Sequence, residues 1–124
     1  MGKYRLIVNP VAGGGTAGQS IPDIERRLHE SGLDFDLVQT ERPWHAVELA
    51  RAAAAEVDVV VAVGGDGTAN EVLNGLMLAK NAGHTATMAV LCVGRGNDFA
   101  FGVGIPTELA AGCEALTADR RRII

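Results

Sequence analysis

The feature that most constrains the fold is the apolar run DVVVAV at residues 58–63, which leads directly into the glycine-rich segment GGDGT at residues 64–68. Most residues of the run are β-branched and none of its interior positions is polar, which is typical of a strand buried on both faces. Strands of this kind occur in parallel sheets whose two sides are covered by helices. The run therefore predicts a central parallel strand, and the glycines predict a turn directly after it.

Strand-like and helix-like segments alternate along the rest of the chain. Further strands are predicted at residues 6–8, at residues 35–40 and at residues 86–93, with a last helix at residues 107–116. Strict alternation implies right-handed crossovers and a parallel sheet with helices on both faces. We therefore predict one α/β domain over residues 1–124, a three-layer α/β/α arrangement around a doubly wound, mostly parallel sheet. The residues expected on the inner faces of the three earlier helices are Ile21, Ile24 and Leu28; Trp44, Val47, Ala50 and Ala54; and Val72, Leu73, Leu76 and Met77.

Charge and composition argue against several classes of protein. A net charge of −4 disfavours binding to nucleic acid or to an anionic membrane by charge alone. No apolar stretch reaches the length of a membrane span, and the N-terminal residues do not resemble a signal peptide, so a cytoplasmic location is expected. Cys92 and Cys113 show no metal-ligand spacing and are interpreted as reduced core residues. His29, His45 and His84 lie on separate segments and are expected at the surface.

Three glycine-rich segments follow predicted strands, at residues 9–18, 64–68 and 94–97. The carboxyl ends of parallel strands meet at one edge of the sheet, where ligands of open α/β folds bind. Turns that open a helix present free backbone N–H groups, and the helix dipole favours an anion there. The three segments together predict a phosphate-binding site.

Asp66 lies among the glycines of the second segment, where a bare carboxylate would repel a phosphate. It could hold Mg²⁺ that bridges phosphate oxygens. It could also accept a proton from a substrate hydroxyl, or simply cap the following helix. These three roles are the alternatives for Asp66.

The first glycine-rich segment also matches the dinucleotide-binding pattern GxGxxG at residues 13–18. That fingerprint requires an acidic residue at the end of the second strand to hold a ribose. Here the strand ends in Gln39-Thr40, and Glu41 comes one position later. A dinucleotide-binding protein is therefore an alternative, with weaker support. The P-loop pattern GxxxxGK[ST] does not occur in the sequence.

Three motifs in order carry a family resemblance: NPVAGGG at residues 9–15, GGDGTANEV at residues 64–72, and GRGNDFA at residues 94–100. They resemble the motifs of the diacylglycerol kinase catalytic domain, which is found in bacterial lipid kinases and in eukaryotic sphingosine and ceramide kinases. The resemblance spans nearly the whole chain. It implies transfer of the γ-phosphoryl group of ATP to a lipid hydroxyl, with Mg²⁺ as a second cofactor. NAD kinases and phosphofructokinases share a related GGDG turn without the continuation seen here.

The resemblance also implies which residues form the site. Asp66 is the expected catalytic carboxylate and a candidate Mg²⁺ ligand. Arg95 stands where the family has Thr; its guanidinium either points to solvent or pairs with a phosphate. The expected nucleotide-binding residues are Asn9, Pro10, Val11, Ala12, Gly13, Thr40, Gly65, Asp66, Gly67, Thr68, Ala69, Asn70, Glu71 and Arg95.

Members of the family continue into a second, β-rich domain, which this chain does not contain. The expected partners are ATP and a lipid acceptor, diacylglycerol or a related lipid, at a membrane surface, with a homodimer left open and nucleic acid not expected. The location implied is cytoplasmic or peripheral at a membrane. Because the isolated chain would lack part of the lipid site, it is expected to transfer phosphate poorly. The alternatives are a non-catalytic nucleotide-binding module and an NAD kinase-like or dinucleotide-binding protein.

Overall fold

The computed structural model of the chain describes residues 3–12 and 14–92. The predictions for Gly13, for the turn and arginine at residues 94–97, for the helix at residues 107–116 and for Cys113 lie outside these ranges. Within these ranges, seven elements follow one another in strict strand–helix alternation. They are β1 (Tyr4–Val8), α1 (Thr16–Glu30), β2 (Phe35–Gln39), α2 (His45–Ala53), β3 (Val59–Gly64), α3 (Asp66–Asn81) and β4 (Thr87–Cys92).

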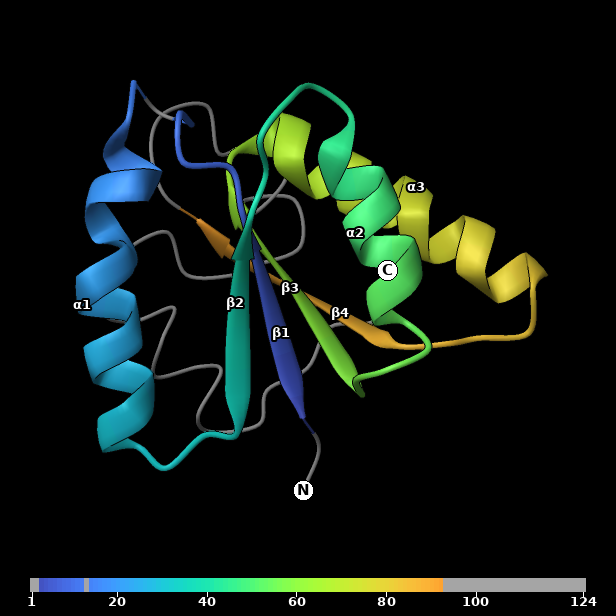
Figure 1. Ribbon diagram of the computed structural model, residues 1–124, viewed down its shortest axis with the longest axis horizontal. Helices are drawn as coiled ribbons and strands as arrows, with labels where there is room; N and C mark the ends of the chain where they lie inside the picture. The colour runs from blue at the N-terminus through green and yellow to red at the C-terminus, as the bar shows by residue number, and fades with distance from the viewer. Residues whose placement is uncertain (1–2, 13, 93–124) are drawn as a thin grey trace.

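The four strands form one parallel sheet in the order β2-β1-β3-β4. Helix α1 lies on one side of this sheet, and α2 and α3 lie on the other (Figure 1). The predicted three-layer α/β/α architecture is confirmed. The run at residues 58–63 corresponds to β3, which pairs with a strand on each side and is buried at every position.

The sheet separates two apolar cores, and the alternation of side chains along each strand assigns residues to one or the other. In β3, Val59, Val61 and Val63 pack with Ile24 and Leu28 of α1. The intervening Val60 and Ala62 pack with residues of α2 and α3 on the opposite side. The central strand thus has no exposed face, which explains why its sequence shows no polar alternation.

Two helices begin earlier than the glycine pattern predicts. Helix α1 starts at Thr16, so Gly18 is helical rather than part of a loop. A Cβ on Gly18 would lie 2.8 Å from the carbonyl oxygen of Pro10, and glycine is therefore required for close packing of the loop on the helix. Helix α3 starts at Asp66, so only Gly65 separates it from β3.

Two large apolar residues lie outside the inner faces to which the sequence pattern assigned them. Trp44 precedes α2 with a left-handed backbone (φ 67°) and is 63% exposed. Met77 of α3 is 58% exposed, while Gly75 and Ala79 take inner positions. Small residues replace large ones there because α2 and α3 approach so closely that a Cβ on Gly75 would lie 2.3 Å from the carbonyl oxygen of Val47.

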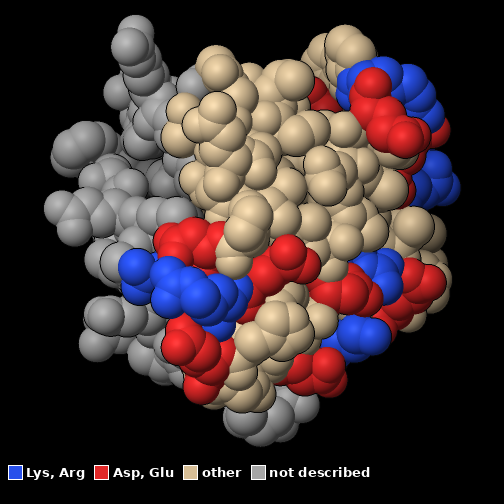
Figure 2. All heavy atoms as spheres, turned by 60° about the vertical axis from the view of Figure 1, so that its left-hand side comes forward, with Lys and Arg blue, Asp and Glu red and all other residues tan. Residues whose placement is uncertain are grey.

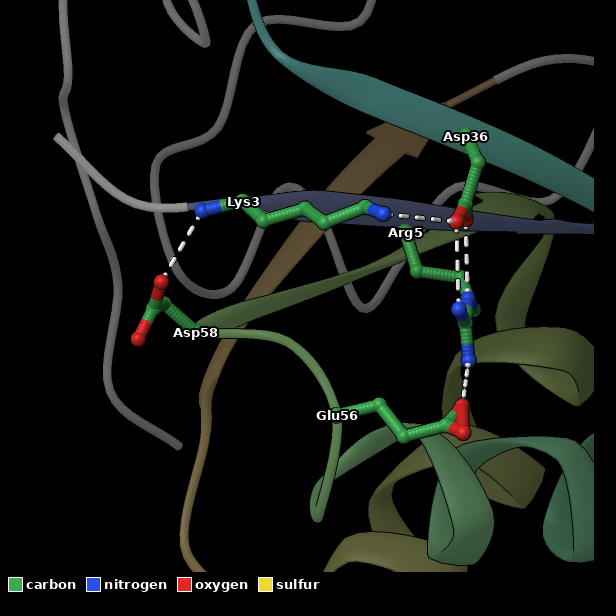
Figure 3. A network of polar contacts seen from close by, with 5 residues as sticks. All are labelled: Lys3, Arg5, Asp36, Glu56 and Asp58. Carbon is green, nitrogen blue, oxygen red and sulfur yellow. Dashed lines mark hydrogen bonds and ion pairs between the residues drawn. The ribbon is translucent and has the colours of Figure 1, made fainter.

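A network of charged side chains joins three segments at the amino end of the sheet (Figure 3). The Arg5 guanidinium of β1 donates from Nε to Asp36 of β2 at 2.8 Å and from Nη1 to Glu56, after α2, at 2.5 Å. The Lys3 ammonium lies 3.6 Å from Asp36, and the Lys3 backbone N–H donates to Asp58 at 2.9 Å. This network lies at the end of the sheet opposite the carboxyl ends of the strands.

Charges of opposite sign are mixed on the side of the molecule where α1 lies, as Figure 2 shows. On α1, Asp23 pairs with Arg26 and Arg27, and Arg26 also pairs with Glu30. The described part of this face therefore presents no broad area of one sign. None of the helices in the described residues is long and apolar enough to cross a membrane.

Candidate functional site

The direction in which successive strands are added to the sheet changes between β1 and β3. From β1 the chain moves by way of α1 to β2 at one edge, and from β3 it moves by way of α3 to β4 at the other. The connections after β1 and β3 therefore leave toward opposite faces (Figure 1). A crevice forms at such a switch point, beyond the carboxyl ends of the strands, and it is the usual ligand site of open α/β sheets.

Backbone hydrogen bonds continue the strand ladders into this edge and fix the residues that follow. The Asn9 N–H donates to the carbonyl of Val63 at 3.2 Å, and the Thr40 N–H donates to the carbonyl of Val8 at 2.8 Å. The Asn9 side-chain oxygen accepts from the N–H of Val11 at 3.3 Å, which shapes the first turn of the loop. Asn9 and Thr40, two predicted site residues, are thus held side by side on adjacent strands.

Close packing around Gly64 brings the first loop and α3 together. A Cβ on Gly64 would lie 2.6 Å from the hydroxyl oxygen of Thr68 and 3.5 Å from the Cβ of Ala12. Thr68 is consequently buried to 4% exposure, although it is polar. The first glycine of GGDGT is required by this packing, because a side chain there would push Thr68 away.

A cleft of about 350 Å³ opens at this point. Six of its lining residues belong to the predicted nucleotide-binding set, and they come from three separate segments: Asn9, Pro10, Val11, Thr40, Thr68 and Glu71. Four further lining residues were not in that set: Glu41, Arg42, Pro43 and Ala46. Their signal in the sequence was their position directly after β2, at the same edge of the sheet.

The other described residues of the predicted set lie beside the cleft and do not line it. Ala12 packs against the core on the α1 side. Ala69 is buried in the opposite core, and its N–H donates to the carbonyl of Gly65 at 3.1 Å. Asp66, Gly67 and Asn70 lie in the first two turns of α3 with at least part of their surface accessible.

The N-terminus of α3 is the feature of this edge best suited to an anion. The N-cap residue of this helix is Gly65, which has no side chain to cap it and enters the helix in an extended conformation (φ −105°). The first N–H groups of a helix have no partner within the helix, and the dipole adds partial positive charge. Phosphate groups bind at such ends.

Gly67 is the residue of this turn that the fold does not explain. It has no positive φ, and a Cβ placed on it would have nothing within 4 Å. Alanine would fit there and would favour the helix more. The absence of a side chain leaves the start of the helix open from outside.

The carboxylates near the cleft are the candidate ligands of a metal ion. Glu41 and Glu71 line the cleft, and Asp66 lies at the start of α3. Among residues 3–12 and 14–92, no three His, Cys, Asp or Glu side chains gather into a site that could hold a metal ion by themselves. This donor set fits Mg²⁺ held by one or two carboxylates together with phosphate oxygens and water, which is the usual arrangement for that ion.

Comparison with known proteins assigns the chain to a family. The model of the diacylglycerol kinase catalytic domain matches residues 3–124. A diacylglycerol kinase of Bacillus subtilis (strain 168) is 36% identical over 109 residues, which cover 87% of this chain and 35% of that protein. A diacylglycerol kinase of Staphylococcus saprophyticus is 31% identical over 115 residues, covering 92% of this chain and 37% of that protein.

A solved structure of a diacylglycerol kinase from Bacillus anthracis superimposes with a TM-score of 0.82 at 30% identity, covering 95% of this chain and 42% of that one. The chain spans little more than a third of the length of the two curated relatives. The match of fold, motifs and family model leads to one conclusion: the chain belongs to the diacylglycerol kinase catalytic domain family.

Proposed function

We propose that this chain is the nucleotide-binding part of an ATP-dependent lipid kinase that phosphorylates the hydroxyl of diacylglycerol or a related lipid. The observation that carries the proposal is the start of α3, with glycine at its N-cap and Gly67 open beside the cleft. The triphosphate binds at this helix end, and the rest of the nucleotide extends into the cleft between Thr68 and Thr40.

The reaction requires positioning and charge neutralisation more than covalent participation of the protein. Phosphoryl transfer passes through a loose transition state whose negative charge must be balanced. Backbone N–H groups and the dipole of α3 supply part of that balance, and Mg²⁺ supplies the rest when bound. Asp66 is the proposed ligand of this ion or the proton acceptor for the lipid hydroxyl, at the helix end where the γ-phosphate lies.

The lipid acceptor reaches this site from a membrane surface in our proposal. The family and the names of the relatives support a lipid kinase, while the acceptor itself is inferred. Arg95 and the rest of the third glycine-rich motif follow β4 in sequence and are proposed to complete the phosphate site. A homodimer is compatible with the proposal and is not needed for it.

The test compares Gly67→Ala with Asn74→Ala, since both place alanine on an exposed position of α3. Gly67→Ala is expected to stabilise the helix by about 0.5–1 kcal/mol and to lower the affinity for Mg·ATP by on the order of tenfold or more, because the new methyl group occupies space needed by the phosphates. Asn74→Ala is expected to leave the affinity unchanged. Calorimetric titration with Mg·ATP and urea unfolding measure the two effects.

Unchanged Mg·ATP affinity in Gly67→Ala would contradict the proposed placement of the phosphates. Tighter binding of NADH than of Mg·ATP by the wild-type chain would favour the dinucleotide-binding alternative. For the transfer step, the protein encoded by the full reading frame that contains these residues is incubated with labelled ATP and diacylglycerol vesicles. Asp66→Asn is expected to abolish labelling of the lipid, and full labelling would remove Asp66 from the mechanism.

A further inference from the structure

One wall of the cleft is a short connection between β2 and α2. Residues 40–43 and Ala46 all line the cleft, so the shape of this segment sets the shape of the cleft on that side. The segment is not part of a helix or strand, and its conformation depends on the few hydrogen bonds it makes. The Thr40 N–H continues the sheet, as described above, and fixes only its first residue.

A tight turn ends the segment. The His45 N–H donates to the carbonyl of Arg42 at 3.2 Å, with Pro43 and Trp44 as the two central residues. Trp44 has φ 67° and ψ 0°, the values of the third position of a type II turn, where glycine is usual. A residue with a Cβ is unfavourable in this conformation, so the turn requires support from its surroundings.

The His45 side chain provides a bond that spans this turn. Its Nδ1 atom accepts from the backbone N–H of Glu41 at 2.9 Å, across the three residues between them. A backbone N–H can only donate, so Nδ1 carries the free lone pair and the ring proton resides on Nε2. In the described structure no side chain caps the start of α2, and the imidazole instead ties the helix's first residue to the cleft wall.

We infer that His45 is a positioning residue for the nucleoside end of the site, acting through Nδ1 on Glu41 and the turn that follows. The inference rests on the proposed function. With the phosphates at the start of α3, the nucleoside extends toward the opposite wall, which is the segment that His45 holds. The Arg42–Glu48 ion pair (2.6 Å) also ties the segment to α2, so loss of the His45 bond lets the strained turn relax and shifts the Glu41 part of the wall.

Three substitutions of His45 test which of its two ring nitrogens makes the bond to Glu41. In His45→Asn the side-chain oxygen takes the place of Nδ1 and can accept from Glu41. In His45→Gln the terminal amide takes the place of Nε2, one bond further out, and cannot span the turn in the same way. His45→Ala removes both. His84→Ala is the control, because His84 is an exposed histidine after α3, away from the residues that line the cleft.

Affinity for Mg·ATP is measured by calorimetry, with inorganic tripolyphosphate as a probe for the phosphate end alone. His45→Ala and His45→Gln are expected to bind Mg·ATP about fivefold to tenfold more weakly, the effect of one net hydrogen bond, whereas His45→Asn and His84→Ala bind as the wild type does. Tripolyphosphate affinity is expected to be the same in all of them. Urea unfolding of each variant confirms that it is folded.

Equal Mg·ATP affinity in all variants, or rescue by Gln instead of Asn, overturns the inference and leaves the proposed function standing. Absence of Mg·ATP binding by the wild-type chain overturns the proposed function and this inference with it. The bond has a signature that does not depend on nucleotide: long-range proton–nitrogen NMR spectra of the free chain are expected to show the His45 proton on Nε2. A proton on Nδ1 would refute the inference directly.

Discussion

Trp44 shows how one residue can depart from the pattern around it. Pro43 followed by a large apolar residue resembles the first turn of an amphipathic helix, which is why the sequence placed the indole on the inner face. The pattern carries no information on backbone φ, and the turn reverses the direction of the side chain before α2 begins. Ala46, Ala50 and Ala53 form the buried face in its place.

The cost of the left-handed backbone at Trp44 can be measured by comparing two variants that both lack the indole. Trp44→Gly is expected to be more stable than Trp44→Ala by about 1 kcal/mol, because alanine retains the unfavourable positive φ and glycine does not. The free energy of unfolding in urea measures the difference. Equal stability of the two variants, or a more stable alanine variant, would show that the turn is not strained.

For the residues of the candidate site, too, the sequence pattern did not give the backbone conformation of the turn. The three motifs and the parallel architecture predicted which segments meet, and six of the predicted residues do line one cleft. The sequence did not show that Asp66 and Gly67 are already helical, because the tightness of the turn depends on the contact between Gly64 and Thr68. That contact lies at the junction of a strand and a helix, and a periodic pattern in the sequence does not show where one ends and the other begins.

At the scale of elements, the packing of α2 on α3 depends on a glycine that sequence patterns treat as a weak helix former. A Cβ on Gly75 would lie 2.8 Å from the Cβ of Ala50 and closer still to the Val47 carbonyl oxygen. The helices therefore approach backbone to backbone, and Met77 and Leu78 are displaced to the surface (58% and 45% exposed). The existence of α3 and most of its inner face (Val72, Leu73 and Leu76) were predictable, whereas the exposure of Met77 was not.

Gly75→Ala is expected to destabilise the protein by about 1–3 kcal/mol, since the two helices must move apart, although alanine favours a helix over glycine. Asn74→Ala, one position earlier on the exposed side of the same helix, is the matched control and is expected to be neutral or slightly stabilising. Urea unfolding of both variants measures the effect. A Gly75→Ala variant as stable as the control would show that the close approach of the helices does not limit packing.

At the scale of the whole molecule, the two ends of the sheet differ in the features they carry. The carboxyl end carries the cleft, and the amino end is held by the Arg5 network (Figure 3). Hydrogen bonding and charge from Arg5 lower the pKa of Asp36 below its usual value of 3.8, and the same contacts raise the pKa of Arg5. Sheet order and this network were not predictable, because both depend on which strands become neighbours.

The lowered pKa of Asp36 gives the network a defined pH dependence. A carboxylate whose pKa is lower in the folded state stabilises the fold above its unfolded pKa, near 4, and loses that contribution as the pH falls through the folded value. Asp36→Asn is therefore expected to be less stable than the wild type at pH 7, and the difference should shrink progressively below about pH 4. Because Asp36 is 38% exposed, the effect at pH 7 should be modest.

Unfolding in urea at pH 7, pH 5 and pH 3 measures this dependence, with Asp34→Asn as an exposed carboxylate control on the same approach to β2. A gap between wild type and Asp36→Asn that stays constant down to pH 3 would contradict the assigned role of the Arg5 contact.

The central position of β1 has a consequence for synthesis on the ribosome. This strand is synthesised before its two neighbours, residues 35–39 and 59–64, so neither of its edges can be paired until those residues have been translated. The cleft needs both partners and the first turns of α3 as well. Parallel pairing over such separations forms slowly, and β1 therefore keeps at least one edge unpaired until the residues of β3 have been synthesised, an interval in which the nascent chain is open to misfolding.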